Sequence, residues 1–159
     1  MRHLIDFGDL SRREWDKLYA RAGKIMDDPQ QYIDVCRGRV MASLFYEPST
    51  RTNFSFQTAM LRLGGTVFGF ADPKSSSTAK GESLKDTIKM VSGYADVVVM
   101  RTPWEGAAKA ASLYSSVPVV NAGDGGHMHP TQTTADLTTI TRLLGRVDGL
   151  AVGLCGDLK

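Results

Sequence analysis

Short apolar runs alternate along the chain with longer segments in which apolar residues recur every three or four positions. Such runs are typical of buried β-strands, and the longer segments are typical of helices that bury one face. The runs predict strands at Val40–Tyr46, Thr66–Phe70, Asp96–Met100 and Val117–Ala122. The longer segments predict helices between Ser11 and Asp28, from Ser49 to Leu63, and at Glu82–Tyr94, Glu105–Tyr114 and Thr131–Leu144. Because strands and helices alternate, we predict an α/β fold in which helices flank a parallel sheet of about four strands on both faces.

One more apolar run, Leu150–Leu154, predicts the beginning of another strand, and the sequence stops five residues later at Lys159. A buried-type strand with so little chain after it is typical of the first element of a second domain. The alternative is an edge strand that closes the sheet, and the hydrophobic pattern alone leaves both open.

Composition adds little to the fold but excludes several classes of partner. Of the 159 residues, 42% are hydrophobic and 23% are charged, and the formal net charge is only +2. Basic and acidic residues are interspersed, so neither nucleic acid nor a membrane is an expected partner. No apolar stretch approaches the roughly 18 residues of a membrane span. Cys36 and Cys155 lie far apart and form no C-x-x-C motif, so we expect free thiols and a cytoplasmic protein.

The most informative polar residues follow the first strand and begin a helix. They are Ser49, Thr50, Arg51 and Thr52. A helix start exposes unpaired backbone N–H groups and the positive end of the helix dipole, so it attracts anions. Hydroxyls and a guanidinium add donors that suit the oxygens of a phosphate. Taken alone, an ordinary Ser/Thr N-cap beside a solvated arginine would be the simpler interpretation.

Further polar residues fall at the ends of the other strands, where ligands bind in open parallel sheets. They are Ser75, Ser76, Ser77 and Lys80 after the second strand, Arg101 after the third, and His129 and Gln132 after the fourth. The serines and Lys80 would also fit a solvated loop, whereas a cation directly after a buried run usually has a partner or a ligand. His127 and His129 lack a third ligand at suitable spacing, so we expect no metal. The strand ends together predict a phosphate-binding pocket that acts by positioning and electrostatic stabilisation, without a cofactor.

Several motifs, taken in order, resemble those of the transcarbamoylase family, and within it the aspartate carbamoyltransferases. They are F-Y-E-P-S-T-R-T, S-S-T-A-K-G-E-S, V-M-R-T-P, N-A-G-D-G followed by H-P-T-Q, and the final G-D-L-K. The resemblance implies a carbamoyl-phosphate-binding domain at residues 1–145 and the start of a truncated aspartate-binding domain at 146–159. It also implies transfer of the carbamoyl group from carbamoyl phosphate to L-aspartate, which gives N-carbamoyl-L-aspartate and phosphate in pyrimidine biosynthesis.

The resemblance assigns roles to the polar residues at the strand ends. The phosphate would be held by Ser49, Thr50, Arg51 and Thr52, with Arg51 also neutralising the leaving group. The carbonyl oxygen would contact Arg101, His129 and Thr52, and Gln132 would bind the carbamoyl NH₂ group. Ser76 and Lys80 would reach into the site of a neighbouring subunit, which implies a homotrimer with sites between subunits. Ser76 is preferred to Ser75 and Ser77 because it lies four residues before Lys80.

Two positions depart from the family pattern S-T-R-T-R-x-S-F-E. Asn53 and Gln57 stand where Arg and Glu are common. The two positions are i and i+4 on a helix, so their side chains are neighbours. We predict that a hydrogen bond between the two amides replaces an ion pair.

The arginines that would bind the aspartate carboxylates are not among these residues. We therefore expect the chain to bind L-aspartate only with the second domain and to be inactive alone. Without that domain, apolar surface should be exposed around Thr131–Leu144 and the last strand. Ornithine carbamoyltransferase is an alternative, because it shares S-T-R-T and H-P-x-Q, although K-G-E-S and N-A-G-D-G favour aspartate. A non-catalytic phosphate-binding or trimerisation module is an alternative from another class.

Overall fold

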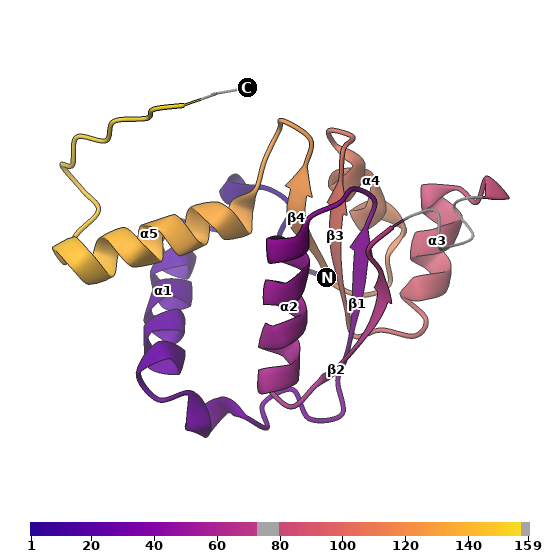
Figure 1. The fold of residues 1–159 in the computed structure, drawn as a ribbon, viewed down its shortest axis with the longest axis horizontal. Helices are drawn as coiled ribbons and strands as arrows, with labels where there is room; N and C mark the ends of the chain where they lie inside the picture. Colours follow the sequence, from indigo (N-terminus) through magenta and orange to yellow (C-terminus); the bar gives the residue numbers. More distant parts are fainter. Residues whose placement is uncertain (73–79, 157–159) are drawn as a thin grey trace.

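The computed structural model describes residues 1–72 and 80–156 and contains a four-stranded parallel sheet with helices on both faces (Figure 1). The strands are β1 (Val40–Phe45), β2 (Thr66–Phe70), β3 (Val97–Thr102) and β4 (Val119–Asp124), in the order β2-β1-β3-β4. The predicted α/β fold is confirmed, and the strand boundaries differ from the prediction by at most two residues. All four strands are parallel, so their carboxyl ends lie at one edge of the sheet.

Five α-helices lie around the sheet in the described part of the chain. They are α1 (Arg12–Asp27), α2 (Thr50–Arg62), α3 (Leu84–Val91), α4 (Ala107–Tyr114) and α5 (Pro130–Leu144), with short 3-10 helices η1 (Phe7–Asp9) and η2 (Pro29–Tyr32). The helices α3 and α4 cover one face, and α2 covers the other, with α5 and α1 beside it (Figure 1). None of the helices in the described part of the chain has both the length and the apolar character needed to cross a membrane.

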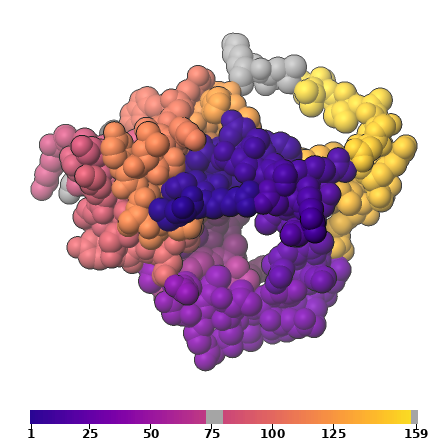
Figure 2. All heavy atoms as spheres, turned by 180° about the vertical axis from the view of Figure 1, so that it is seen from behind, coloured from indigo at the N-terminus to yellow at the C-terminus, as the bar shows by residue number. Residues whose placement is uncertain are grey.

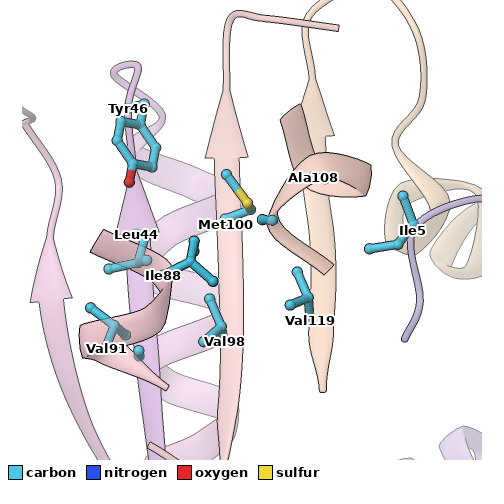
Figure 3. Close-up of a cluster of buried hydrophobic side chains, with 11 residues drawn as sticks. Ile5, Leu44, Tyr46, Ile88, Val91, Val98, Met100, Ala108 and Val119 are labelled. Atoms are coloured by element: carbon cyan, nitrogen blue, oxygen red, sulfur yellow. The ribbon is translucent and has the colours of Figure 1, made fainter. Parts of the chain in front are cut away.

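Alternate residues of the central strands point to opposite faces and form two apolar clusters. The cluster on the α3–α4 face includes Leu44, Val98, Met100, Ile88, Val91 and Ala108 (Figure 3). The cluster on the α2 face consists of Met41, Phe45, Met60, Val99 and Ala122. Full burial of a large apolar side chain contributes about 1.5–3 kcal/mol. The strands that end at the candidate site are therefore held firmly from both faces.

The N-terminal region supports the sheet and α5. Leu4 forms a parallel bridge to Val120, so it extends the sheet beyond β4. A capping box begins α1, because Ser11 N–H donates to Glu14 Oε2 at 2.8 Å. At the other end of α1, Asp27 pairs with Arg142 of α5 at 2.9 Å. This ion pair links α1 to α5.

The segment after α5 forms no strand, so the prediction of a strand at Leu150–Leu154 is wrong. Gly145, with a left-handed backbone (φ 71°), ends α5. The residues that follow run along the outside of the molecule (Figure 2), and Val152 and Leu154 are 67% and 77% exposed. A strand needs a neighbour that satisfies its backbone N–H and C=O groups, and within the described residues this segment has none.

Apolar side chains at the end of α5 are also exposed, which confirms the expectation for this helix. Leu143 is 77% exposed and Leu144 is 59% exposed. With Val152 and Leu154, they leave several large apolar side chains uncovered within a short stretch of sequence. Clustered exposed apolar side chains are typical of a surface that another part of a protein covers.

Candidate functional site

A pocket of about 740 Å³ lies at the carboxyl ends of the sheet strands, between the starts of α2 and α5. Its lining residues are Pro48, Ser49, Thr50, Arg51, Thr52, Ser55, Phe56, Arg101, His129, Thr131, Gln132 and Ala135. Seven of the nine predicted site residues are among them. These seven come from three separate segments of the sequence, and the fold brings them together.

The other two predicted site residues are not part of this lining. Lys80 is exposed and lies outside the pocket of its own chain. Ser76, like its alternatives Ser75 and Ser77, lies outside the described residues. Their roles stay predictions.

The start of α2 presents free backbone donors. Ser49 is the N-cap residue, and its side chain makes no capping hydrogen bond. The first bond of the helix runs from Asn53 N–H to the Ser49 carbonyl oxygen at 3.1 Å. The N–H groups of Thr50, Arg51 and Thr52 precede this bond and therefore lack a partner within the helix. These N–H groups and the Ser49 hydroxyl are available to an anion.

A buried amide network fixes α2 to the sheet. Gln57 Nε2 donates to Asn53 Oδ1 at 2.7 Å, which confirms the predicted hydrogen bond between the two amides. Ser43 of β1 donates its hydroxyl to the same oxygen at 2.9 Å. Asn53 is only 4% exposed, so these bonds form in a region of low dielectric constant, where hydrogen bonds are strong. The network holds the start of α2 in place without a charged pair.

Arg101 is held at the pocket by a carboxylate that is not among the predicted site residues. Arg101 Nε donates to Glu47 Oε1 at 2.7 Å, and Nη1 donates to the Ala122 carbonyl oxygen at 3.4 Å. The side chains of Arg101 and Glu47 are 25% and 27% exposed. The available signal for Glu47 was its position in F-Y-E-P-S-T-R-T, two residues beyond Phe45, which pairs with Arg101 in the sheet.

His129 is the N-cap residue of α5. Its Nδ1 accepts a hydrogen bond from Gln132 N–H at 3.3 Å and lies 3.3 Å from Thr131 Oγ1. Because Nδ1 is an acceptor, the neutral ring carries its proton on Nε2. Burial, followed by the nearby Arg101 guanidinium, lowers the pKa of His129. His129 is therefore a neutral N–H donor near pH 7.

Gly123, the residue before the end of β4, lets Arg101 and His129 approach one another. Its φ is 120°, a conformation that residues with a side chain rarely adopt. A Cβ atom at this position would lie 3.2 Å from Arg101 Nη1 and 3.5 Å from His129 Cδ2. The glycine thus belongs to the site although it does not line the pocket.

Gln132 is oriented by its own helix. Its Nε2 donates to Asp136 Oδ1 at 2.9 Å, one turn further along α5. One of the two amide N–H groups is therefore engaged, and the carbonyl Oε1 is the group of this side chain that can accept a hydrogen bond from a ligand. A ligand NH₂ group is the matching donor.

The pocket is suited to an anion with several oxygens. Two guanidinium groups, Arg51 and Arg101, converge there with the N-terminal ends of α2 and α5 and several hydroxyls. Within residues 1–72 and 80–156, no group of three or more His, Cys, Asp or Glu side chains could hold a metal ion. Fold and site together define an α/β protein with a pocket suited to a phosphate-type anion at the carboxyl ends of a parallel sheet.

Comparison with known families makes this class specific. The sequence profile described as "Aspartate/ornithine carbamoyltransferase, carbamoyl-P binding domain" matches residues 2–142. The chain belongs to this family.

Relatives of known name agree with this assignment. The aspartate carbamoyltransferase catalytic subunit of Clostridium perfringens (strain ATCC 13124) is 57% identical over 158 residues, which are 99% of this chain and 52% of the relative. The subunit of the same name from Lachnoclostridium phytofermentans is 58% identical over 159 residues, which are 100% of this chain and 52% of the relative. The chain spans about half the length of the curated relatives it matches.

Solved structures show the same relation. Aspartate transcarbamoylase from Trypanosoma cruzi, in complex with carbamoyl aspartate and phosphate, superposes with a TM-score of 0.92 at 40% identity. The match covers 99% of this chain and 49% of that chain. The catalytic subunit of M. jannaschii aspartate transcarbamoylase gives a TM-score of 0.87 at 50% identity, over 94% of this chain and 50% of that chain.

Proposed function

We propose that the pocket binds carbamoyl phosphate and that the chain forms the carbamoyl-phosphate-binding half of an aspartate carbamoyltransferase. The observation that carries the proposal is the convergence of Arg101, His129 and the S-T-R-T start of α2 on one pocket, in a chain of the carbamoyl-phosphate-binding family. The names of the relatives favour L-aspartate over ornithine as the acceptor.

The free donors suggest how the ligand would lie. The phosphate would sit at the start of α2, where Arg51, the hydroxyls of Ser49, Thr50 and Thr52 and the unpaired N–H groups can share its oxygens. The carbonyl oxygen would face Arg101 and His129, with Thr52 nearby. The carbamoyl NH₂ group would donate to Gln132 Oε1, because Oε1 is the acceptor of this amide and Nε2 already donates to Asp136.

The reaction follows from this placement. The amine of L-aspartate attacks the carbonyl carbon, a C–N bond forms, and the bond from that carbon to the phosphate oxygen breaks. The amine loses a proton, and phosphate leaves with the electron pair of the broken bond. Arg101 and the neutral His129 would stabilise the negative charge that develops on the carbonyl oxygen, and Arg51 would stabilise the leaving phosphate. Catalysis would therefore depend on positioning and on fixed charges.

The rest of the enzyme belongs to the same proposal. Residues 1–145 would form the carbamoyl-phosphate domain and 146–159 would begin the next one, and L-aspartate would bind only when that second part is present. The chain would be inactive alone and act in the cytoplasm as part of a homotrimer. Ser76 and Lys80 would complete the site of a neighbouring subunit, and the exposed position of Lys80 outside its own pocket supports this arrangement.

Calorimetry with carbamoyl phosphate tests the proposal. A charge-assisted hydrogen bond contributes about 1.5–3 kcal/mol, so Arg101→Ala should weaken binding by about 10- to 100-fold. Arg13→Ala is the matched control, because Arg13 is an exposed arginine of α1 outside the pocket, and it should bind as the unmodified chain does. Equal affinity of the Arg101→Ala and Arg13→Ala variants would contradict the site assignment.

Light scattering and an activity assay separate the alternatives. Trimers without carbamoyl phosphate binding would favour an assembly module. Production of carbamoyl aspartate by the purified chain alone would contradict the expected need for the second part.

A further inference from the structure

Asp124, the last residue of β4, is a fully buried carboxylate outside the pocket lining. An ionised carboxylate in this environment is costly unless hydrogen bonds compensate for the lost water. Its Oδ1 accepts from Asn121 Nδ2 at 3.0 Å and from Met128 N–H at 3.2 Å, and its Oδ2 accepts from Gly106 N–H at 3.0 Å. The ring of His127 lies beside it, with Nδ1 at 3.2 Å from Oδ2. The carboxylate is thus fully engaged by groups of the protein.

These donors come from separate segments. Asn121 lies in β4, Gly106 is the N-cap residue of α4, and Met128 belongs to the loop between β4 and α5. The loop also closes on Asp124 through its backbone, because Asp124 N–H donates to the Met128 carbonyl oxygen at 3.2 Å. Met128 directly precedes His129. The carboxylate therefore fixes the peptide that delivers His129 to the pocket.

Asp124 and the next residue, Gly125, also contact the strand that carries Arg101. Gly125 N–H donates to the Thr102 carbonyl oxygen at 2.8 Å, and Thr102 pairs with Asp124 across the sheet after an irregularity in the register. Thr102 follows Arg101 directly and is fully buried. Asp124 thus lies between the two segments that present Arg101 and His129.

We propose that Asp124 is a positioning residue that holds His129 in place relative to Arg101. It touches no ligand in this arrangement and acts through Met128 and the loop. The expected effect on carbamoyl phosphate affinity rests on the proposed function, whereas the expected effect on the position of the His129 ring does not.

The variant Asp124→Asn keeps the size of the side chain but replaces one acceptor oxygen by an NH₂ group that faces N–H donors. In nitrogen-detected NMR of the imidazole rings, the unmodified chain should show His129 with its proton on Nε2. In Asp124→Asn we expect a mixture of the two neutral ring forms. We also expect carbamoyl phosphate to bind at least about tenfold more weakly, because small displacements of positioned groups are costly.

Asp9→Asn is the matched control. Asp9 also uses its carboxylate to accept two backbone N–H bonds, from Ile5 at 2.7 Å and Asp6 at 2.9 Å, but it lies in η1, outside the pocket. It should lower the melting temperature without changing the His129 ring or the affinity. A folded Asp124→Asn variant with an unchanged His129 ring would overturn the proposal. If the unmodified chain fails to bind carbamoyl phosphate, the proposed function is wrong, and the ring signals still decide the role of Asp124.

Hydrogen exchange of the unmodified chain gives a second test that does not require the variant to fold. Met128 lies outside any helix or strand, and Gly106 precedes the first residue of α4. Their N–H groups donate to a buried carboxylate, so both should exchange more slowly than other N–H groups that lie outside helices and strands. Rapid exchange at both would overturn the proposal.

Discussion

Replacement of Gly123 by alanine tests whether the close approach of Arg101 and His129 creates the site. The added methyl group would lie 3.2 Å from Arg101 Nη1 and 3.5 Å from His129 Cδ2. The first of these distances is tighter than an ordinary van der Waals contact, so the guanidinium must shift by a few tenths of an ångström. The change therefore acts on the two side chains assigned to the carbonyl oxygen without removing either of them.

Two effects are expected, one on the stability of the fold and one on ligand binding. Alanine at φ 120° is strained by about 1–3 kcal/mol, which lowers the stability of the fold. A displaced Arg101 also loses much of a charge-assisted hydrogen bond to the ligand, which contributes about 1.5–3 kcal/mol. Carbamoyl phosphate should therefore bind about 10- to 100-fold more weakly to Gly123→Ala.

Gly145→Ala is the control for backbone strain. Gly145 has φ 71°, and a Cβ atom there would have no neighbour within 4 Å. The left-handed conformation should cost about 1–2 kcal/mol, which lowers the melting temperature of a domain of this size by roughly 2–8 °C. Thermal melting and calorimetry of both variants separate the two contributions. If Gly123→Ala bound carbamoyl phosphate as tightly as Gly145→Ala, the close approach would not matter and the reasoning would be wrong.

Two further predictions concern charge. In the Glu47→Gln variant, Arg101 loses its carboxylate partner, so the fold should be less stable. Because a negative charge beside Arg101 is removed, the affinity for inorganic phosphate should rise severalfold. Asp27→Asn, at the far end of α1, is the control and should leave that affinity unchanged. Burial and Arg101 lower the pKa of His129 in the folded chain, so the unfolded chain binds more protons below the ordinary value of 6.5. The free energy of unfolding should therefore decrease as the pH falls from 6.5 through the lowered pKa. In the His129→Gln variant, the part of that decrease that His129 causes should be lost. Equal slopes of the free energy of unfolding against pH for this variant and the unmodified chain would refute the lowered pKa of His129.

The sequence was sufficient to predict the sheet and most of the pocket lining. Continuous apolar runs mark strands that are buried on both faces, and parallel strands bring their carboxyl ends to one edge. Arg101, His129 and residues 49–52 could therefore be expected to lie together before any contact was known. The amide pair Asn53–Gln57 was equally accessible, because helix geometry alone makes i and i+4 neighbours.

The residues that organise the pocket were harder to predict because their roles depend on the pairing between strands. Glu47 contacts Arg101 only because β1 and β3 pair with Phe45 opposite Arg101. Gly123 and Asp124 matter because β4 lies beside β3 in a register that places them next to Arg101 and Thr102. Sequence periodicity fixes which side of a strand a residue occupies, but it does not fix which residue of the neighbouring strand lies opposite.

The difference between an apolar pattern and an available pairing partner also explains why the strand predicted at Leu150–Leu154 is absent. An apolar run shows that a segment can be buried, whereas a strand also needs a free edge with which to pair. The outer edge of β4 is occupied by the N-terminal segment, because Leu4 N–H donates to the Val119 carbonyl oxygen at 2.9 Å and Asn121 N–H donates to the Leu4 carbonyl oxygen at 2.8 Å. Residues 150–154 therefore cannot close the sheet beside β4. Within the described part of the chain they pair with no other strand either, so the edge-strand interpretation fails. Their apolar side chains stay exposed after α5, so any element that buries them must come from outside the described sheet.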